Sequence, residues 1–132
     1  MPTISGSYEG QFYSTNVASI GDASTYTTAS DNIIDVTHAA SIALQGSAVC
    51  GTSASGDVLF RILARVNKDW DEITNPFTSL TLNQIVNTTA RGTILVNCRD
   101  VEALKIGSIE NTATSTDNGS LAEVNCKYSI GF

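Results

Sequence analysis

The sequence predicts an all-β protein: a single antiparallel β-sandwich or jelly roll with an extended N-terminal arm. Short apolar stretches alternate with polar residues at a period of two, and clusters of Gly, Asn, Asp and Ser separate them. Almost no helical period is present, and no internal repeat is visible. Short alternating strands between turn signals are typical of sandwiches and jelly rolls. The 132 residues fit one domain that is long enough to bury a core.

The stretch from Asp57 to Ile73 carries the clearest alternation. The residues that share its apolar parity are Val58, Phe60, Ile62, Ala64 and Val66. Asn67-Lys68-Asp69 then supplies turn chemistry, and Trp70 reopens an extended run. This pattern predicts a β-hairpin of the sandwich. Because tryptophans that follow such turns commonly pack across a core, we expect Trp70 to be buried.

The remaining strands follow from the same parity argument. One apolar parity runs from Ile34 to Leu44 and includes His38, which we expect in the core or at an interface; Gln45-Gly46-Ser47 is expected to end this strand as a turn. Further inward positions are predicted at Ile94, Val96 and Cys98, at Leu104, Ile106 and Ser108, and at Ala122, Val124, Cys126, Tyr128, Ile130 and Phe132. The spacing of Leu82, Ile85 and Val86 predicts one helical turn.

Composition divides the chain into an arm, residues 1–31, and a sandwich domain, residues 32–132. The arm is rich in Gly, Ser, Thr and Tyr and has few apolar residues to bury. It therefore needs support from its own sandwich or from a neighbouring subunit, and we take the neighbour as the working hypothesis. The aromatic residues expected to bind a partner are Tyr8, Phe12, Tyr13 and Tyr26.

Charge and cysteine content restrict the partners. The net charge is −6 and the seven Lys and Arg residues are dispersed, which argues against nucleic acid. No run approaches the roughly twenty apolar residues of a membrane helix, and the N-terminus lacks the pattern of a signal peptide. The odd number of cysteines argues against a pure disulfide framework, and no pair has metal-ligand spacing. Cys98 and Cys126 share the parity of apolar neighbours, so both are interpreted as buried thiols, and a Cys98–Cys126 disulfide remains an alternative. We expect no metal and no cofactor.

Candidate catalytic groups are sparse. His38 is the single histidine, so any Ser/His/Asp or Cys/His arrangement would depend on it. Asp69, Asp71 and Glu72 lack the spaced Asp/Asn/Gly pattern of a calcium loop, and we interpret them as a solvated turn. Paired carboxylates for sugar hydrolysis would have to come from residues that any acidic β protein carries. The sequence therefore predicts a protein that is not an enzyme.

One pattern resembles a known group of proteins. The hairpin Val66-Asn67-Lys68-Asp69-Trp70-Asp71-Glu72-Ile73 is followed by Arg91-Gly92-Thr93-Ile94-Leu95-Val96 and by Val101-Glu102-Ala103-Leu104-Lys105-Ile106. Over residues 57–110 this succession resembles the small β-sandwich proteins of tailed-phage particles. The resemblance implies a structural protein of the virion, such as a capsid decoration (cement) protein or a tail or neck component, with no catalytic residues.

These inferences combine into one leading hypothesis and an alternative. The leading hypothesis is a non-enzymatic virion protein, made in the host cytoplasm, that oligomerises as a trimer and binds a capsid or tail protein. The charge-poor composition, with 15% charged residues against roughly 25% in typical domains, suits a surface that faces another protein. The alternative is a carbohydrate-binding module or an adhesin head, in which Trp70, Tyr26 or neighbouring loops contact sugar.

Overall fold

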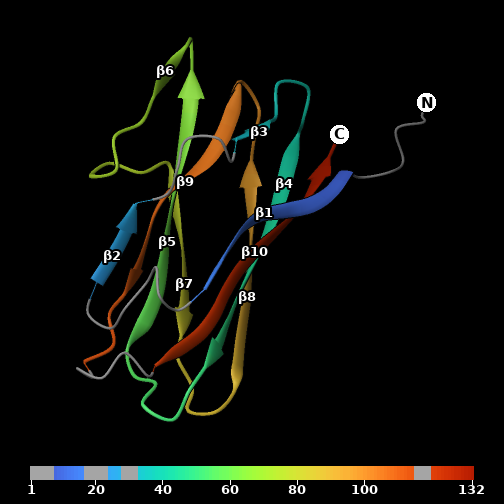
Figure 1. The fold of residues 1–132 in the computed structure, drawn as a ribbon. Helices are drawn as coiled ribbons and strands as arrows, with labels where there is room; N and C mark the ends of the chain where they lie inside the picture. The colour runs from blue at the N-terminus through green and yellow to red at the C-terminus, as the bar shows by residue number, and fades with distance from the viewer. Residues whose placement is uncertain (1–7, 17–23, 28–32, 115–119) are drawn as a thin grey trace.

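Every element of the described chain is a β-strand, which confirms the predicted all-β class. The computed structural model describes residues 8–16, 24–27, 33–114 and 120–132; for 8–16, 24, 26 and 27 it describes the backbone only. The strands are β1 (Tyr8–Asn16), β2 (Ser24–Thr27), β3 (Ile33–Asp35), β4 (Ser41–Cys50), β5 (Asp57–Val66), β6 (Asp69–Trp70), β7 (Thr78–Asn83), β8 (Thr89–Asn97), β9 (Ala103–Asn111) and β10 (Leu121–Gly131). Figure 1 shows them as two layers.

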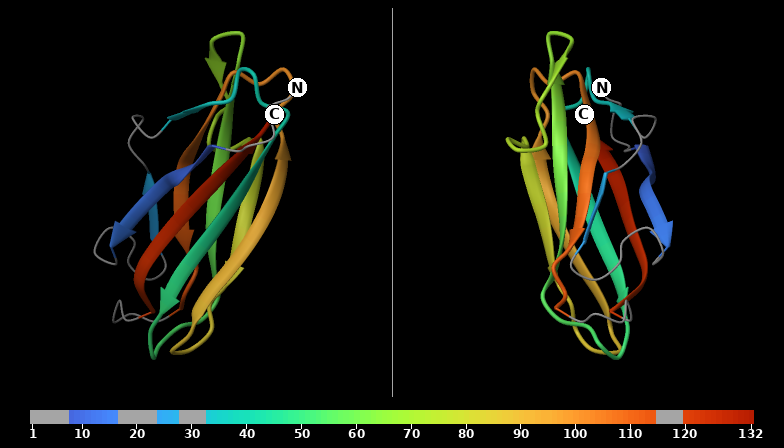
Figure 2. Two further views of the ribbon diagram at one scale, coloured as in Figure 1. Left: turned by 90° about the vertical axis from the view of Figure 1, so that its right-hand side faces the viewer. Right: turned by 60° about the vertical axis from the view of Figure 1, so that its left-hand side comes forward.

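The strands form two antiparallel sheets. Sheet A has the order β1-β10-β4-β8. Sheet B has the order β2-β9-β5-β6, with β3 also paired to β9 and β7 also paired to β5. Figure 2 shows the two sheets face to face. The strands within residues 1–31 thus lie at sheet edges of this same chain, β1 beside β10 and β2 beside β9. The division into an arm, residues 1–31, and a sandwich domain, residues 32–132, stays a prediction.

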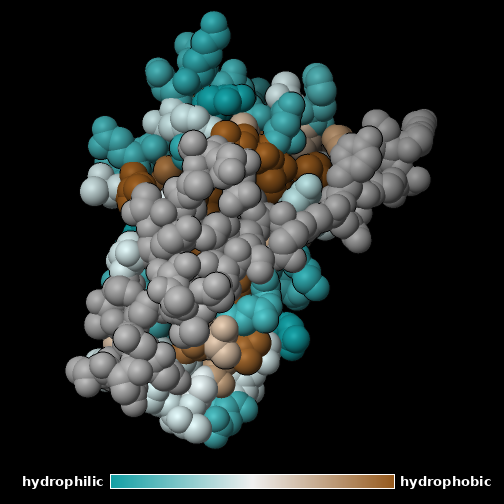
Figure 3. All heavy atoms as spheres, in the orientation of Figure 1, coloured by the Kyte–Doolittle hydropathy of each residue, from teal (hydrophilic) through white to brown (hydrophobic). Residues whose placement is uncertain are grey.

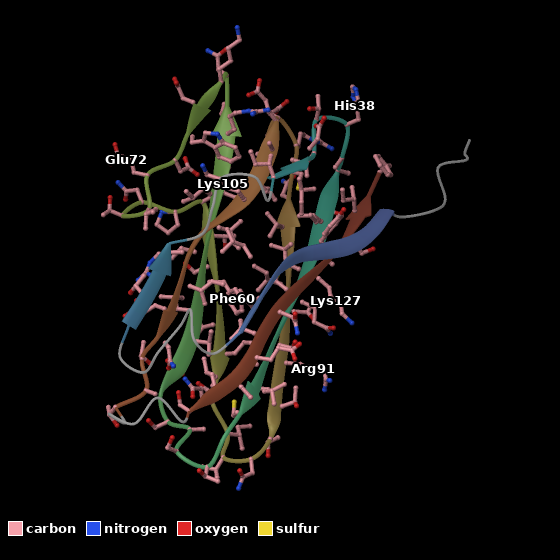
Figure 4. The ribbon with its side chains drawn as sticks, viewed as in Figure 1. His38, Phe60, Glu72, Arg91, Lys105 and Lys127 are labelled. Carbon is pink, nitrogen blue, oxygen red and sulfur yellow. The ribbon has the colours of Figure 1, made fainter. Side chains whose placement is uncertain are left out.

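The core is the apolar layer between the sheets. Its largest fully buried side chains include Phe60 and Ile62 of β5, Ile42 and Leu44 of β4, and Leu104, Ile106 and Ile109 of β9. Alternating inward residues predicted this layer for most strands, because side chains of a strand point to opposite faces in turn. Phe60 lies between the two sheets in Figure 4.

Two register irregularities change the predicted parity. β5 and β9 shift register between Arg61 and Ile62, so Gly107 is an extra residue on β9. Ser108 therefore lies opposite Arg61 and bonds to its guanidinium, and Ile109 enters the core instead. A second shift between Leu121 and Glu123 buries Leu121.

Ala122 and Phe132 are exposed, so the prediction that both point inward is wrong. The register shift at the start of β10 displaces Ala122 from the inward parity, and Phe132 lies beyond the end of the strand. The inward positions of Val124, Cys126 and Ile130 are confirmed, since all three are buried.

Two predicted local structures are absent because the strands are longer than expected. β4 runs through Gln45-Gly46-Ser47 without a turn, and β7 includes Leu82, where a helical turn was expected. The β7–β8 connection is instead a tight turn, closed by a 3.1 Å bond from the Thr88 amide to the Ile85 carbonyl, with Asn87 at φ 53°. Gly46 signals a turn in the sequence, but in the structure it lies within β4 and allows the close approach of Leu80.

Gly46 and Gly92 form a recess in sheet A. They are direct partners in the β4–β8 ladder. A Cβ atom built on Gly46 would lie 2.8 Å from Leu80 Cδ2, and one built on Gly92 would lie 2.9 Å from Leu82 Cδ2. The two leucines of β7 therefore occupy the space that side chains at these glycines would fill. This close approach closes one side of the core.

Substituting Gly46→Val tests this interlock. The added methyl groups would overpack the site against Leu80 and Phe60, so we expect the free energy of unfolding to fall by about 1–3 kcal/mol. Urea unfolding followed by circular dichroism measures the change. Ser47→Val on the same strand, half-buried and one residue along, is the matched control and should change stability by less than about 0.5 kcal/mol. Equal losses in both variants would contradict the interlock.

Candidate functional site

Two surface features stand out: one around Trp70 on sheet B, and β8, an edge strand of sheet A. The first, here the Trp70 surface, consists of Arg65, Trp70, Glu102 and Lys105. Trp70 follows the β5–β6 turn, in which Asn67 and Lys68 have positive φ values of 51° and 73°, as a two-residue primed hairpin turn requires. In Figure 3 hydrophilic residues cover the top of the molecule, where this hairpin projects.

Trp70 is half-buried on the outer face of sheet B, and the prediction that it packs in the core is wrong. It pairs with Arg65, which has the parity opposite to the core residues of β5. The Arg65 guanidinium carbon lies 5.4 Å from the ring centroid, and Lys105 Nζ lies 4.4 Å from it. Both are cation–π distances. The indole thus lies against two cations instead of the core.

Of the two cations beside the indole, Arg65 forms a salt bridge and Lys105 does not form one with any described residue. Glu102 accepts a 3.3 Å bond from Arg65 Nε and a 3.0 Å bond from the Lys68 amide. Lys105 carries no local signal in the sequence, because it lies 35 residues from Trp70 along the chain. Only the β9–β5–β6 pairing brings the two residues together.

Residues 71–77 cover the neighbouring part of this outer face. Ile73 packs near Leu63, which is only 4% exposed although its parity points away from the core, and both lie over Gly107. Asp71 Oδ2 accepts a 3.0 Å bond from the Ala64 amide, and the Phe77 amide donates to the Ile62 carbonyl at 2.9 Å. The connection is therefore fastened at both ends, which holds the Trp70 surface in place.

The acidic residues near Trp70 are dispersed, in agreement with a solvated turn. Asp69 and Glu72 are exposed, and the Asp71 carboxylate bonds to the backbone. Figure 4 shows Glu72 on the loop, away from the strands. Within the described ranges, no three His, Cys, Asp or Glu side chains gather as metal ligands would.

The second feature is β8, one of the two edge strands of sheet A. Just outside β8, the Cys98 amide donates to the Ala40 carbonyl at 3.0 Å, and the Thr88 carbonyl accepts from the Cys50 amide at 3.1 Å. Residues 88 and 98 thus direct their backbone groups toward β4. Because direction alternates along a regular ladder, the odd-numbered residues 89–97 direct their N–H and C=O groups away from the sheet.

Leu95 lies in this edge and is 75% exposed, the largest exposure among the exposed large hydrophobic residues of the described chain. β8 contains no proline and one charged residue, Arg91, and its pairing with β4 shows no register shift. Natural sheet edges are usually protected by charges, prolines or bulges. β8 therefore has the properties of a strand that pairs with a partner. In the sequence, Leu95 was visible as an apolar residue on the polar parity between Thr93 and Asn97.

A hollow of about 450 Å³ adjoins one end of the β8 edge. Its lining is mixed, with Leu82, Ile85 and Ala90 beside Asn83 and Arg91. Ile85 is 53% exposed. Arg91 projects outward from sheet A in Figure 4, as does Lys127 of β10. The edge and hollow together present backbone groups, apolar side chains and positive charge.

The four predicted partner-binding residues lie on the two N-terminal strands. Tyr8 and Tyr13 pair with Ile130 and Cys126 of β10, Phe12 lies at the register shift of β1, and Tyr26 pairs with Ile109 of β9. Their side chains lie outside the described part of the structure. The structure thus places their backbones at the edges opposite β8 and β7, and their role in partner binding stays a prediction.

His38 and the cysteines are placed as follows. His38 lies exposed in the turn between β3 and β4, so its expected burial in the core is wrong; the turn at residues 37–38 interrupts the parity of β3 and β4. Cys98 and Cys126 are buried thiols, as predicted, and Cys50 is buried as well. Burial raises the pKa of Cys98 from 9.0 to about 11 and that of Cys126 to about 12. No helix in the described residues is long and apolar enough to span a membrane.

Comparison with known proteins finds no family and only weak structural similarity. No family model and no curated protein matches the sequence. Similar solved structures include a chain of the Bacillus endospore appendages, which are disulfide-linked pili (12% identity, TM-score 0.41, covering 95% of this chain and 85% of that one). A second is a chain of the infectious bursal disease virus particle (12%, TM-score 0.49), of which this chain spans 30%, with 94% of its own length covered.

A third similar structure is a carbohydrate-binding module, CBM28, specific for non-crystalline cellulose (11% identity, TM-score 0.46, covering 96% of this chain and 73% of that one). These identities and TM-scores are too low to carry an argument about function. The class that the fold defines is an antiparallel β-sandwich.

The raised thiol pKa values predict a loss of stability at alkaline pH. Above about pH 9 the unfolded chain loses thiol protons that the folded chain keeps, so the free energy of unfolding falls as pH rises toward 11 and 12. Urea unfolding at pH 8, 9.5 and 10.5 measures this slope. Cys126→Ala removes one of the two thiols and should make the slope shallower, while an unchanged slope would show that other groups cause the loss.

Proposed function

We propose that this protein is a non-enzymatic structural component of a tailed-phage virion, a capsid decoration protein that binds the particle surface as an oligomer. The observation that carries the proposal is the open β8 edge, with outward backbone groups and an exposed Leu95. Such an edge gains most of its affinity from main-chain hydrogen bonds and from covering apolar side chains. An assembly supplies both, and repetition by symmetry strengthens weak single contacts.

The low charge of the chain supports the same proposal. Outward positions of sheet A include Thr93 of β8, Gln45 and Ser47 of β4, and Asn125 of β10. Desolvating a face with few charges costs less free energy than desolvating a charged one, because a buried charge must be paired and hydrogen-bonded. The trimer, the choice of capsid or tail protein as partner and the position in the particle belong to this proposal, and a tail or neck component is its closest variant.

Binding to particles tests the proposal. We expect mass spectrometry of purified virions from the source culture to find the chain in a constant ratio to the major capsid protein. Purified full-length protein should rebind stripped particles, and deletion of residues 1–20, which removes β1, should weaken rebinding at least tenfold while circular dichroism still shows the β fold. Absence from virions overturns the function, and full rebinding by the shortened chain overturns the role of the arm.

A carbohydrate-binding module is the second candidate, and the surface position of Trp70 favours it. A partly buried indole beside the cations of Lys105 and Arg65 places an aromatic ring and hydrogen-bond donors together. These are groups that a sugar ring with hydroxyls can use. The Trp70 surface lies on sheet B, away from the β8 edge, so the two candidates make separate predictions.

A glycan array followed by calorimetry tests this candidate. If the Trp70 surface binds sugar, Trp70→Ala should weaken binding at least tenfold, since it removes the ring. Phe77→Ala, which removes another partly exposed aromatic residue near the loop, is the matched control and should leave affinity within twofold. The melting temperature of both variants shows that each is folded. No signal on any glycan, or an unchanged affinity in Trp70→Ala, removes this candidate.

A further inference from the structure

We infer that the partner of the β8 edge is the same edge of a second copy, joined about a two-fold axis that passes beside Thr93. This inference rests on the proposed function, because it names one contact of the oligomer. It starts from the outward backbone groups at residues 89, 91, 93, 95 and 97. Two such edges can exchange hydrogen bonds as antiparallel strands without any change to sheet A.

The sequence of β8 is self-complementary in this arrangement. Thr93 is the midpoint of Thr89–Asn97, so the register centred on it is the one that pairs all nine residues. Thr93 then meets Thr93 of the second copy, a cross-strand pair that is favourable in sheets. Thr89 meets Asn97 of the second copy, which pairs two polar side chains.

The same register covers Leu95. It places Leu95 opposite Arg91 of the second copy, whose aliphatic stem can lie on the leucine while its guanidinium stays in water. The two Arg91 residues are then four positions apart along the ladder, about 13 Å, which exceeds the screening length at physiological salt. A register centred on residue 91 would instead bring the two arginines together, and one centred on residue 95 would set Arg91 opposite Arg99. Charge therefore disfavours both of these registers, and the register centred on Thr93 pairs the most residues of β8.

The surroundings permit the contact. Charged side chains on the outer face of sheet A near the edge include Arg91 of β8 and both Glu123 and Lys127 of β10, and β4 carries none. The net charge of −6 is therefore not concentrated where the copies meet. The contact is isologous, so it closes at two copies; an assembly that also contains the expected trimer would hold six.

Sedimentation velocity of the purified full-length protein, from 1 μM to 500 μM, tests the inference. We expect reversible association into even-numbered species. Leu95→Lys places a charge on the edge and should raise the dissociation constant at least tenfold. Gln45→Lys is the matched control, since it adds the same charge to the exposed neighbouring position on β4, and should change the constant less than threefold. Melting temperatures verify that both variants fold.

A second measurement locates the contact directly. A nitroxide attached to Thr93→Cys should show strong dipolar broadening in the associated protein, because the two labels face each other across the axis. Unsubstituted protein, whose three thiols are buried, controls for background labelling. Absence of broadening, a monomer at every concentration, a trimer as the sole oligomer, or association lost on deletion of residues 1–20 but not in Leu95→Lys would each overturn the inference.

These outcomes are separable from those of the proposed function. Self-association is measured on the protein alone, whereas the function is measured by binding to particles. A monomeric protein that still binds virions overturns the two-fold contact only. A two-fold dimer that is absent from virions overturns the virion function only.

Discussion

The close approach of the two sheets at Gly46 and Gly92 is the contact on which the arrangement of the molecule depends. Leu80 and Leu82 of β7 enter the space above the two glycines, so β7 lies against β4 and β8. The contact of β7 with β4 and β8 closes the core at the β7–β8 side of the sandwich, with no loop of the described chain between the packed strands. It also leaves β8 at the margin of sheet A, with half of its backbone groups directed into solvent.

The outer face of sheet B is organised by a different constraint. β5 pairs with both β6 and β7 along one edge, and residues 71–77 between them must leave the plane of the sheet. They fold over the outer face, where Ile73 covers Leu63 above the bulge at Gly107. Trp70 lies partly buried on the same outer face, beside Lys105, instead of in the core. The loop thus decides which surface could receive a ligand.

The two candidate functions draw on different parts of the molecule. Assembly would use the backbone of β8 and the side chain of Leu95, whereas sugar binding would use the indole of Trp70 and its neighbouring cations. Both can exist in one protein, because an edge of sheet A and the outer face of sheet B do not compete for space. The open edge carries more weight, since unprotected strand edges are costly in a protein that acts alone.

The sequence by itself determined the all-β class, the β5–β6 hairpin, most inward positions and the burial of Cys98 and Cys126. These features follow from local rules, because alternation and turn residues act over a few positions. Only the tertiary structure decided the rest. Gly46 signals a turn locally, yet the leucines of a distant strand make it a packing site.

Long-range pairing also set the positions that sequence reasoning misjudged. The bulge at Gly107 redirected Ser108, a turn removed His38 from the core, and pairing with the outward-facing Arg65 put Trp70 on the outer face of sheet B. The same holds for the candidate sites: β9 brings Lys105 to Trp70, and strand order places β8 at the end of sheet A, paired with β4 on one side. Which strand lies at an edge is a property of the whole sheet, and no local pattern records it.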